Sequence, residues 1–164
     1  MELATPRLRL CALEPAGLRA LLGGVAAPGA RWARGYPLDG SLVAAAMQLE
    51  RLDAGADRGP FGLFHILVRE AGDLVVGDIG FHGAPDELGI VSIGFGIVPA
   101  ARHRGYAAEA LRTVLDWALG RPEVRAVCAD TDLVHLDSQR VLVSAGMRLA
   151  AAEGDRKLYE IQAS

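Results

Sequence analysis

The sequence predicts a fold of the α/β (α+β) class, in which a mixed, mostly antiparallel sheet of about seven strands is flanked by about four helices. Two observations support this prediction. Short apolar segments separated by turns rich in glycine and proline recur along the 164 residues, as is typical of β-strands. Other segments carry apolar residues every three or four positions, which is typical of helices packed on a sheet. Because no linker, internal repeat or low-complexity segment interrupts the chain, we expect one domain covering residues 1–164.

The first half of the chain contains three expected strands and two expected helices: strands over 7–13, 61–69 and 74–81, and helices over 18–22 and 41–52. The second and third strands, joined by a short turn, are expected to pair antiparallel. The loop before the second helix carries Trp32 and Tyr36. Two interpretations of these aromatic residues stay open: they line a ligand pocket, or they fix the loop to the core.

The second half of the chain is centred on a strand, a basic turn and a helix over residues 91–119. A strand over 124–130 follows, and we expect it to be parallel to the earlier strand because a helix connects the two. A helix over 136–145 and a hairpin of strands over 148–153 and 157–161 complete the pattern.

The strand over 91–97 has two unlike faces. Its apolar residues share one face because they are spaced by two: Val91, Ile93, Phe95 and Ile97. The opposite face is almost without side chains, since it carries Ser92, Gly94 and Gly96. A strand this bare on one face allows another molecule to lie against its backbone.

The turn after this strand has the properties of an anion site. Arg102, His103, Arg104 and Gly105 stand just before the expected helix. Unpaired backbone N–H groups and the positive end of the helix dipole coincide there with two arginines. The glycine permits the backbone to approach a phosphate closely. We therefore predict a phosphate-binding turn, in preference to the alternative of a solvated basic loop.

Composition and charge exclude several classes of function. Seventeen basic and 20 acidic residues give a net charge of −3, which argues against a nonspecific nucleic-acid binder. The apolar runs are far shorter than a membrane span and the N-terminus lacks the pattern of a secretory signal, so we expect a cytoplasmic protein without a membrane partner. Cys11 and Cys128 are expected to be buried free thiols, and the histidines show no metal-ligand spacing, so no metal is expected.

Three short motifs occur in an order and at a spacing that point to a family. They are Thr5-x-Arg7-Leu8-x-Leu10, Arg102-x-x-Gly105-x-Ala107, and Ser138-Gln139-Arg140-Val141-Leu142 followed by Gly146-Met147. With these motifs the whole chain resembles the GNAT superfamily of acyl-CoA-dependent N-acetyltransferases. The resemblance is greatest to the branch that acetylates the N-termini of ribosomal proteins.

The resemblance implies acetyl-CoA as cosubstrate, without a metal, and a splay between the fourth and fifth strands where its pantetheine arm enters. It assigns cofactor-binding roles to these positions: the backbone of His103, Gly105, Tyr106 and Ala107 for the pyrophosphate, the side chains of Arg102 and Arg104 beside it, and the backbone of Ile97 and Val98 for the pantetheine arm.

The chain departs from the pattern of the branch where a catalytic base is expected. Ser92 stands in place of a glutamate that serves as general base in relatives, and a serine does not accept a proton at neutral pH. Either another group accepts the proton, or the amine arrives already neutral after losing its proton to solvent. For the first alternative His82 is the candidate catalytic base, because the ordinary pKa of histidine is about 6.5. Asp78, Asp86 and Glu87 are further candidates nearby.

Two other departures concern the region of the late helix. His135 stands where the branch has an asparagine that bonds the pantetheine amide, and imidazole is also able to form such a bond. Leu142 stands where many members have a tyrosine that protonates the departing thiolate. Ser138 is the remaining candidate for this catalytic role and for contact with the cofactor.

Two functions agree with these features. The first is an N-acetyltransferase, which moves an acetyl group from acetyl-CoA to a primary amine, on a protein N-terminus or a small molecule, by direct attack through a tetrahedral intermediate. The second is a noncatalytic acyl-CoA-binding or regulatory module of the same fold, as Ser92 and Leu142 suggest. A dinucleotide-binding domain is disfavoured because residues 99–104 separate the strand from Gly105. The acceptor amine and a homodimer through an exposed late strand stay open.

Overall fold

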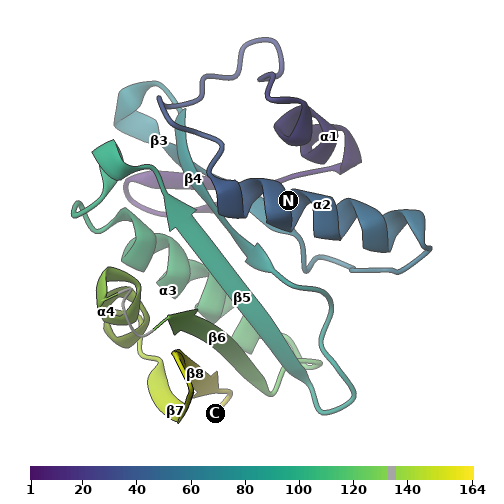
Figure 1. Ribbon diagram of the computed structural model, residues 1–164, viewed down its shortest axis with the longest axis vertical. Coiled ribbons are helices and arrows are strands. Elements are labelled where there is room, and N and C mark those ends of the chain that lie inside the picture. Colours follow the sequence, from purple (N-terminus) through teal and green to yellow (C-terminus); the bar gives the residue numbers. More distant parts are fainter. Residues whose placement is uncertain (133–135) are drawn as a thin grey trace.

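The computed structural model describes residues 1–132 and 136–164, which form one eight-stranded sheet with four helices around it (Figure 1). The strands are β1 (Glu2–Ala4), β2 (Leu8–Ala12), β3 (Leu63–Val68), β4 (Leu74–Phe81), β5 (Ile90–Ile97), β6 (Ala126–Asp132), β7 (Arg148–Glu153) and β8 (Arg156–Gln162). The helices are α1 (Pro15–Gly23), α2 (Asp39–Asp53), α3 (Tyr106–Leu119) and α4 (Leu136–Ser144). The strand order across the sheet is β1-β2-β3-β4-β5-β6-β8-β7.

The pairing of the strands confirms the predicted mixed, mostly antiparallel sheet. β5 and β6 are parallel, and the other neighbouring strands of the described chain are antiparallel. The expected strands and helices are all present. The additional strand is β1, which pairs with β2 over only three positions and is too short to show a periodic pattern.

The helices cover both faces of the sheet, with α1 and α2 on one face and α3 on the other (Figure 1). The buried residues of α3 are small or aliphatic apart from one tyrosine: Tyr106, Ala108, Ala110, Leu111, Val114, Leu115 and Ala118. Because alanines at the interface allow the helix axis to approach the strands closely, the first turn of α3 is held next to the end of β5.

β5 and β6 diverge soon after they begin. Their register covers three positions, from Ile90 opposite Ala126 to Ser92 opposite Cys128. β5 continues to Ile97 without a β6 partner among the described residues. The predicted splay of this strand pair is therefore present, and it leaves one edge of β5 open next to α3.

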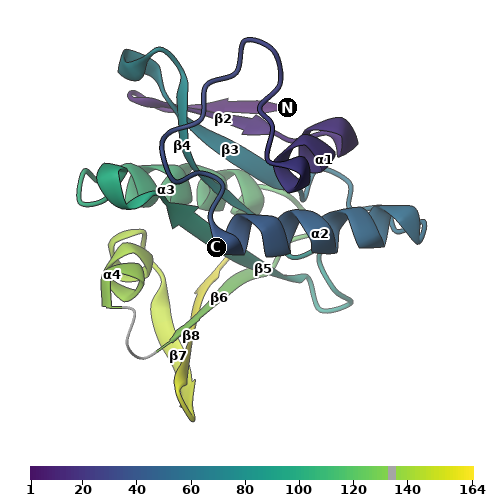
Figure 2. The same cartoon turned by 45° about the horizontal axis from the view of Figure 1, so that its top comes forward.

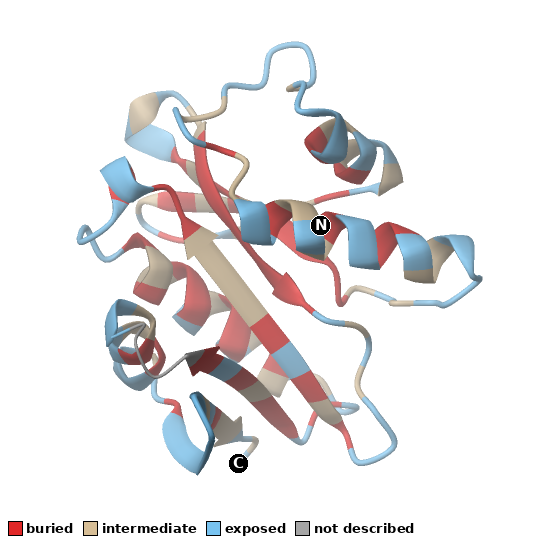
Figure 3. Cartoon of the chain, viewed as in Figure 1, coloured by how far each residue is buried: buried red, intermediate tan, exposed pale blue. Residues whose placement is uncertain are grey.

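The C-terminal hairpin and α4 extend from one end of the sheet (Figure 2). β7 is the outer strand, and each of its residues is exposed (Figure 3). The sequence left open a homodimer through an exposed late strand, and β7 is that strand.

Cys11 and Cys128 are free thiols, but each is half-buried, so the expectation of full burial is wrong. Cys11 shares a sheet face with Arg9, and Cys128 lies opposite the exposed Ser92, so neither thiol faces the packed core. Partial burial still raises the pKa of both thiols.

Over residues 1–132 and 136–164, no helix has the length and apolar character needed to cross a membrane. Within the same residues, no three His, Cys, Asp or Glu side chains are grouped closely enough to hold a metal ion.

His65 on β3 is a largely buried histidine with an unpaired ring nitrogen. Its Nε2 is buried and has no hydrogen-bond partner in the described structure. The ring packs edge-to-face on Tyr36, with 5.5 Å between the ring centroids. Because a charged imidazole would lose its hydration here, burial lowers the pKa of His65 from 6.5 to about 4.

We expect His65 to lower the free energy of unfolding of the protein as the pH is reduced from 6.5 to about 4. The unfolded chain binds a proton on this histidine in that window and the folded chain does not, so the free energy of unfolding falls as the pH falls. The lost contribution is roughly 3 kcal/mol. Urea unfolding at neutral pH and near pH 4 measures it, and His65→Leu should show the smaller fall. An equal fall in both proteins would contradict the expectation.

Candidate active site

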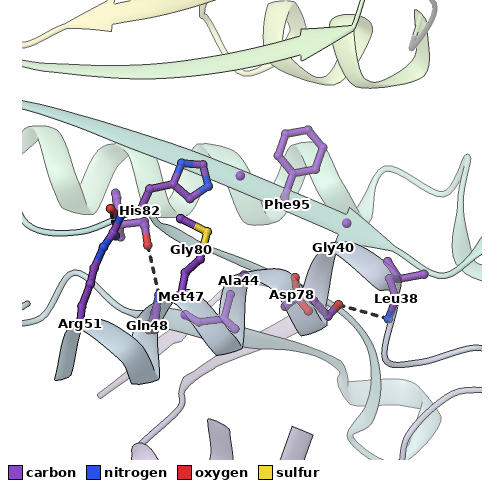
Figure 4. Close-up of a pocket in the computed structure, with 15 residues that line it drawn as sticks. Leu38, Gly40, Ala44, Met47, Gln48, Arg51, Asp78, Gly80, His82 and Phe95 are labelled. Atoms are coloured by element: carbon purple, nitrogen blue, oxygen red, sulfur yellow. Dashed lines mark hydrogen bonds between the residues drawn. The ribbon is translucent and has the colours of Figure 1, made fainter. Parts of the chain in front are cut away.

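β4 and β5 form the floor of a cleft beneath α2, which we call the α2 cleft (Figure 4). Asp78 lies opposite Gly96 in the strand register, and Gly80 lies opposite Gly94. Residues two apart on a strand share a face, so the glycines leave a hollow with Asp78 at one end and His82 at the other. The cleft has a volume of about 310 Å³, and the apolar side chains that face it are those of Leu38, Ala44, Met47 and Leu63.

His82 lies in the α2 cleft beside Ser92. Its backbone N–H donates to the Ser92 carbonyl at 2.9 Å, so the two side chains stand on the same face of adjacent strands. The imidazole extends over Gly94, where a Cβ would lie 3.0 Å from Nε2. The ring therefore occupies the floor next to the serine that replaces the expected glutamate.

His82 is exposed at the mouth of the cleft, yet its surroundings favour the neutral form of its ring. Partial burial lowers the pKa of His82 below 6.5, and the charge of Arg51 acts in the same direction, while Asp130 opposes them. Arg51 also donates a hydrogen bond to the His82 backbone carbonyl. A neutral imidazole has one ring nitrogen free to accept a proton at neutral pH.

Asp78 forms the other end of the floor and is only 5% exposed. The Tyr36 hydroxyl donates to its Oδ2 at 2.8 Å, and Ser41 forms a second side-chain hydrogen bond. Burial raises the pKa of Asp78 even though both hydrogen bonds act to lower it. Asp78 is thus a buried, oriented carboxyl group at the edge of the α2 cleft.

Trp32 and Tyr36 are absent from the lining of the α2 cleft. Their rings pack edge-to-face with 5.7 Å between centroids, and Trp32 forms a β-bridge with Val75. Of the two interpretations of these aromatic residues, the structure supports the one in which they fix the loop to the core. Tyr36 additionally orients Asp78, a contact that connects the loop to the cleft.

A second cleft opens where β6 has diverged from β5, and we call it the α3 cleft. It lies among the end of β5, the turn at Pro99–Ala101, the start of α3 and the start of α4, and its volume is about 620 Å³. Seven of the residues that the sequence analysis assigned to cofactor binding line this cleft: Ile97, Arg102, His103, Gly105, Tyr106, Ala107 and Ser138.

The first turn of α3 presents backbone N–H groups at this cleft. Gly105 precedes the helix with a φ of 81°, and His103 has a φ of 63°, so both are left-handed. N–H groups at the start of a 14-residue helix have no partners within the helix, and the dipole is positive there. A diphosphate fits this donor set, because its oxygens accept hydrogen bonds and carry negative charge.

The backbone of β5 also faces the α3 cleft. The Val98 N–H donates to the Val76 carbonyl at 2.8 Å, which places Val98 on the side of β4. Hydrogen-bonding direction alternates along an antiparallel strand, so the peptide groups of Phe95 and Ile97 point to the opposite edge. That edge is the one that β6 has left, so these groups are directed at the cleft.

Several residues that were expected to contact acetyl-CoA have other positions or partners in the structure. Val98 is buried, and both its N–H and its C=O are paired within the chain, so the structure does not bring it to the cleft. Arg102 lines the cleft but its Nε donates to the Ile97 carbonyl at 2.8 Å. Arg104 is not among the residues that line the cleft. His135 lies outside the described residues.

The late helix supplies further lining residues that the sequence did not nominate. Asp137 approaches His103 at 3.6 Å and Arg140 at 3.5 Å, so it connects the turn to α4 across the mouth of the α3 cleft. These side chains are well exposed, and such pairs contribute little to stability. Leu142, by contrast, is 1% exposed and belongs to the core. No spacing rule distinguishes Asp137 from other polar residues of a surface helix, and Arg140 was noted only as a member of the late-helix motif.

Known proteins share both sequence and fold with this chain. Residues 7–148 match the acetyltransferase (GNAT) domain. The uncharacterized N-acetyltransferase YjdG of Bacillus subtilis is 37% identical over 84 residues, which are 51% of this chain and 50% of that protein. The chain therefore aligns with about half the length of that curated relative.

Solved structures resemble the protein over nearly its whole length. An acetyltransferase from Agrobacterium tumefaciens strain C58 has a TM-score of 0.69 and 21% identity, and the match covers 99% of this chain and 94% of that one. RimL, the ribosomal L7/L12 α-N-protein acetyltransferase in complex with coenzyme A, has a TM-score of 0.69 and 12% identity, with 99% and 98% covered. With the domain match over residues 7–148 and a sheet that splays next to a glycine turn, the chain belongs to the GNAT family of acetyltransferases.

Proposed function

We propose that the protein is an N-acetyltransferase that binds acetyl-CoA in the α3 cleft and a primary amine in the α2 cleft. The observation that carries this proposal is that the two clefts share Phe95 and Gly96 on β5. Two reactants held on either side of one strand segment are brought together in the orientation that direct transfer needs.

The α3 cleft suits the diphosphate and the pantetheine arm of acetyl-CoA. The N–H groups from His103 to Ala107 are positioned to bind the diphosphate, with Arg102 nearby as a positive charge. The peptide N–H groups of Phe95 and Ile97 are positioned to bind the thioester oxygen as it gains negative charge. RimL, whose fold is related, has been solved in complex with coenzyme A, and this supports the assignment.

His82 is proposed as the general base and Ser138 as the proton donor. The bound ammonium group first loses one proton to solvent. As the resulting amine nitrogen bonds to the acetyl carbon, the neutral His82 imidazole accepts the second proton that the nitrogen loses. The carbon–sulfur bond then breaks, and the hydroxyl of Ser138 passes a proton to the departing thiolate while it takes up another from solvent, to which His82 later releases its own. Ser138 is half-buried in the first turn of α4 and lines the α3 cleft, which supports its role.

The α2 cleft favours an acceptor that has one amine and a small apolar body. Among the residues that line this cleft, Asp78 is the only one with a carboxyl group. One carboxylate attracts one ammonium group, while the apolar walls do not solvate additional charges. We therefore propose a protein N-terminus with a small first residue, or a small monoamine, in preference to a polyamine or an aminoglycoside.

A noncatalytic acyl-CoA-binding module is the second candidate. Two features favour it. Position 92 carries a serine and therefore no carboxylate, and position 142 of the late helix carries a buried leucine where many family members have a tyrosine. Such a module would bind acetyl-CoA and release no free thiol in the presence of any amine.

A thiol-release assay over a panel of amines tests both candidates. With acetyl-CoA as donor, we expect turnover with short peptides that begin with a small residue or with small monoamines, and at least about tenfold lower kcat/KM with spermidine and aminoglycosides. Asp78→Asn should raise KM for the preferred amine. Turnover that is faster with polycations would overturn the proposed acceptor class. Calorimetric binding of acetyl-CoA without turnover on any amine would favour the binding module.

A further inference from the structure

Arg7, which precedes β2, is bonded to the turn at the start of α3. Its Nη1 donates to the Arg104 carbonyl at 2.8 Å, across 97 residues of sequence. Its Nε donates to Oε1 of Glu109 at 2.8 Å, and its guanidinium carbon lies 4.7 Å from the centroid of the Tyr106 ring. One side chain therefore contacts the turn before the helix and the first turn of the helix itself.

Glu109 is held on the side of Arg7 by several bonds. The Arg7 N–H donates to its Oε2 at 3.1 Å, and the Thr5 hydroxyl donates to the same oxygen. Thr5 is fixed in turn because its Oγ1 accepts a bond from the Leu8 N–H at 2.8 Å. A carboxylate in the first turn of a helix repels an anion bound at the helix start, and the paired guanidinium cancels this charge.

The bond from Arg7 to the Arg104 carbonyl also sets the direction of the next N–H group. In a planar trans peptide, the C=O of Arg104 and the N–H of Gly105 point in opposite directions. Arg7 and Arg104 are absent from the lining of the α3 cleft, whereas Gly105 is part of it. Drawing the carbonyl toward Arg7 therefore turns the Gly105 N–H toward the cleft.

We infer that Arg7 is a positioning residue for the diphosphate of acetyl-CoA. It acts through the turn: it orients the Gly105 amide, cancels the charge of Glu109 and packs on Tyr106. The inference rests on the proposed function, because it requires acetyl-CoA in the α3 cleft. It gives the opening motif Thr5-x-Arg7 a role in binding the cosubstrate, in addition to starting a strand.

The test compares two acetyl donors that differ in the diphosphate. Arg7→Gln should raise KM for acetyl-CoA at least about tenfold, because a charged, forked donor is lost, while kcat stays within about twofold. S-acetylpantetheine lacks the diphosphate, so its kcat/KM should be the same in the variant and in the wild type. Calorimetry with acetyl-CoA measures the same loss without an acceptor.

Arg9→Gln is the matched control. Arg9 has similar side-chain exposure, 34% against 40% for Arg7, and pairs with Glu2 and Asp73 away from the turn. We expect Arg9→Gln to leave kcat/KM unchanged with both acetyl-CoA and S-acetylpantetheine. Arg7→Lys keeps the charge but loses the forked N–H donors of the guanidinium group, so it should also raise KM for acetyl-CoA. This variant replaces Arg7→Gln in the test if Arg7→Gln does not fold.

Three outcomes would overturn the inference: wild-type KM for acetyl-CoA in Arg7→Gln, wild-type KM in Arg7→Lys, or equal losses with both donors, which indicate a general structural role. These outcomes are distinct from failure of the proposed function. That function fails if the wild-type protein itself does not bind acetyl-CoA, whereas the inference alone fails if wild type and Arg7→Gln bind it equally.

Discussion

Replacing His82 by glutamine is expected to lower kcat about 100-fold or more and to leave KM for acetyl-CoA nearly unchanged. Glutamine keeps a polar side chain of similar reach but does not accept a proton from the amine. His82 lies over Gly94 in the α2 cleft and is not among the residues that line the α3 cleft, so the loss should appear in the chemical step. Steady-state thiol release with the amine found in the screen measures it.

The dependence of kcat on pH gives the same substitution a second readout. A base acts in its unprotonated form, and the pKa of His82 is lowered below 6.5. Activity of the wild type should therefore rise with pH through an apparent pKa below 6.5 and level off at higher pH. In His82→Gln this acid limb should be absent.

Asp78→Asn separates the two ends of the α2 cleft. If His82 is the base, the asparagine variant keeps the acid limb and loses mainly affinity for the amine. Loss of the limb in Asp78→Asn, together with its retention in His82→Gln, would contradict the assignment and identify Asp78 as the base. Glu87, a further candidate base from the sequence, is exposed in the turn after β4 and lines neither cleft, so Glu87→Gln should change neither quantity.

Much of the cofactor side was readable from the sequence because its signals are local. The left-handed Gly105 and the helix period after it occur within one continuous stretch, and short-range geometry places them together. The bare face at Gly94 and Gly96, by contrast, forms the floor of the α2 cleft. The same locality explains why Arg102 was expected at the cofactor site and does line the α3 cleft. Ser138 also lines it, but it was expected there from the family resemblance of the late helix.

The acceptor side could be predicted only in part, because it depends on strand register and on the position of α2. Nothing local shows that Asp78 faces Gly96, or that Leu38 lies over that glycine, where a Cβ would be 2.8 Å from its Cδ1. Tyr36 was noted as an aromatic residue near a pocket, but its contact with Asp78 spans 42 residues. Arg7 was recognised as part of a motif, while its bond to Arg104 required the folded chain.

The central claim of this account is that acetyl-CoA binds at the turn before α3. Gly105→Val is expected to weaken its binding about 100-fold, because the turn loses both its conformation and its close approach to the ligand. Gly105 has a φ of 81°, and a Cβ there would lie 3.1 Å from Nη2 of Arg7. A side chain at this position therefore moves the backbone that presents the N–H groups.

Calorimetric titration of acetyl-CoA into the wild type, Gly105→Val and Gly154→Val tests this claim directly. Gly154 has a left-handed φ of 59° in the β7–β8 hairpin and no atom within 4 Å of an added Cβ, so it carries a similar backbone penalty far from the α3 cleft. We predict tight binding to the wild type and to Gly154→Val, and a loss in Gly105→Val alone. Equal binding by all three proteins would contradict the site that the account assigns to acetyl-CoA.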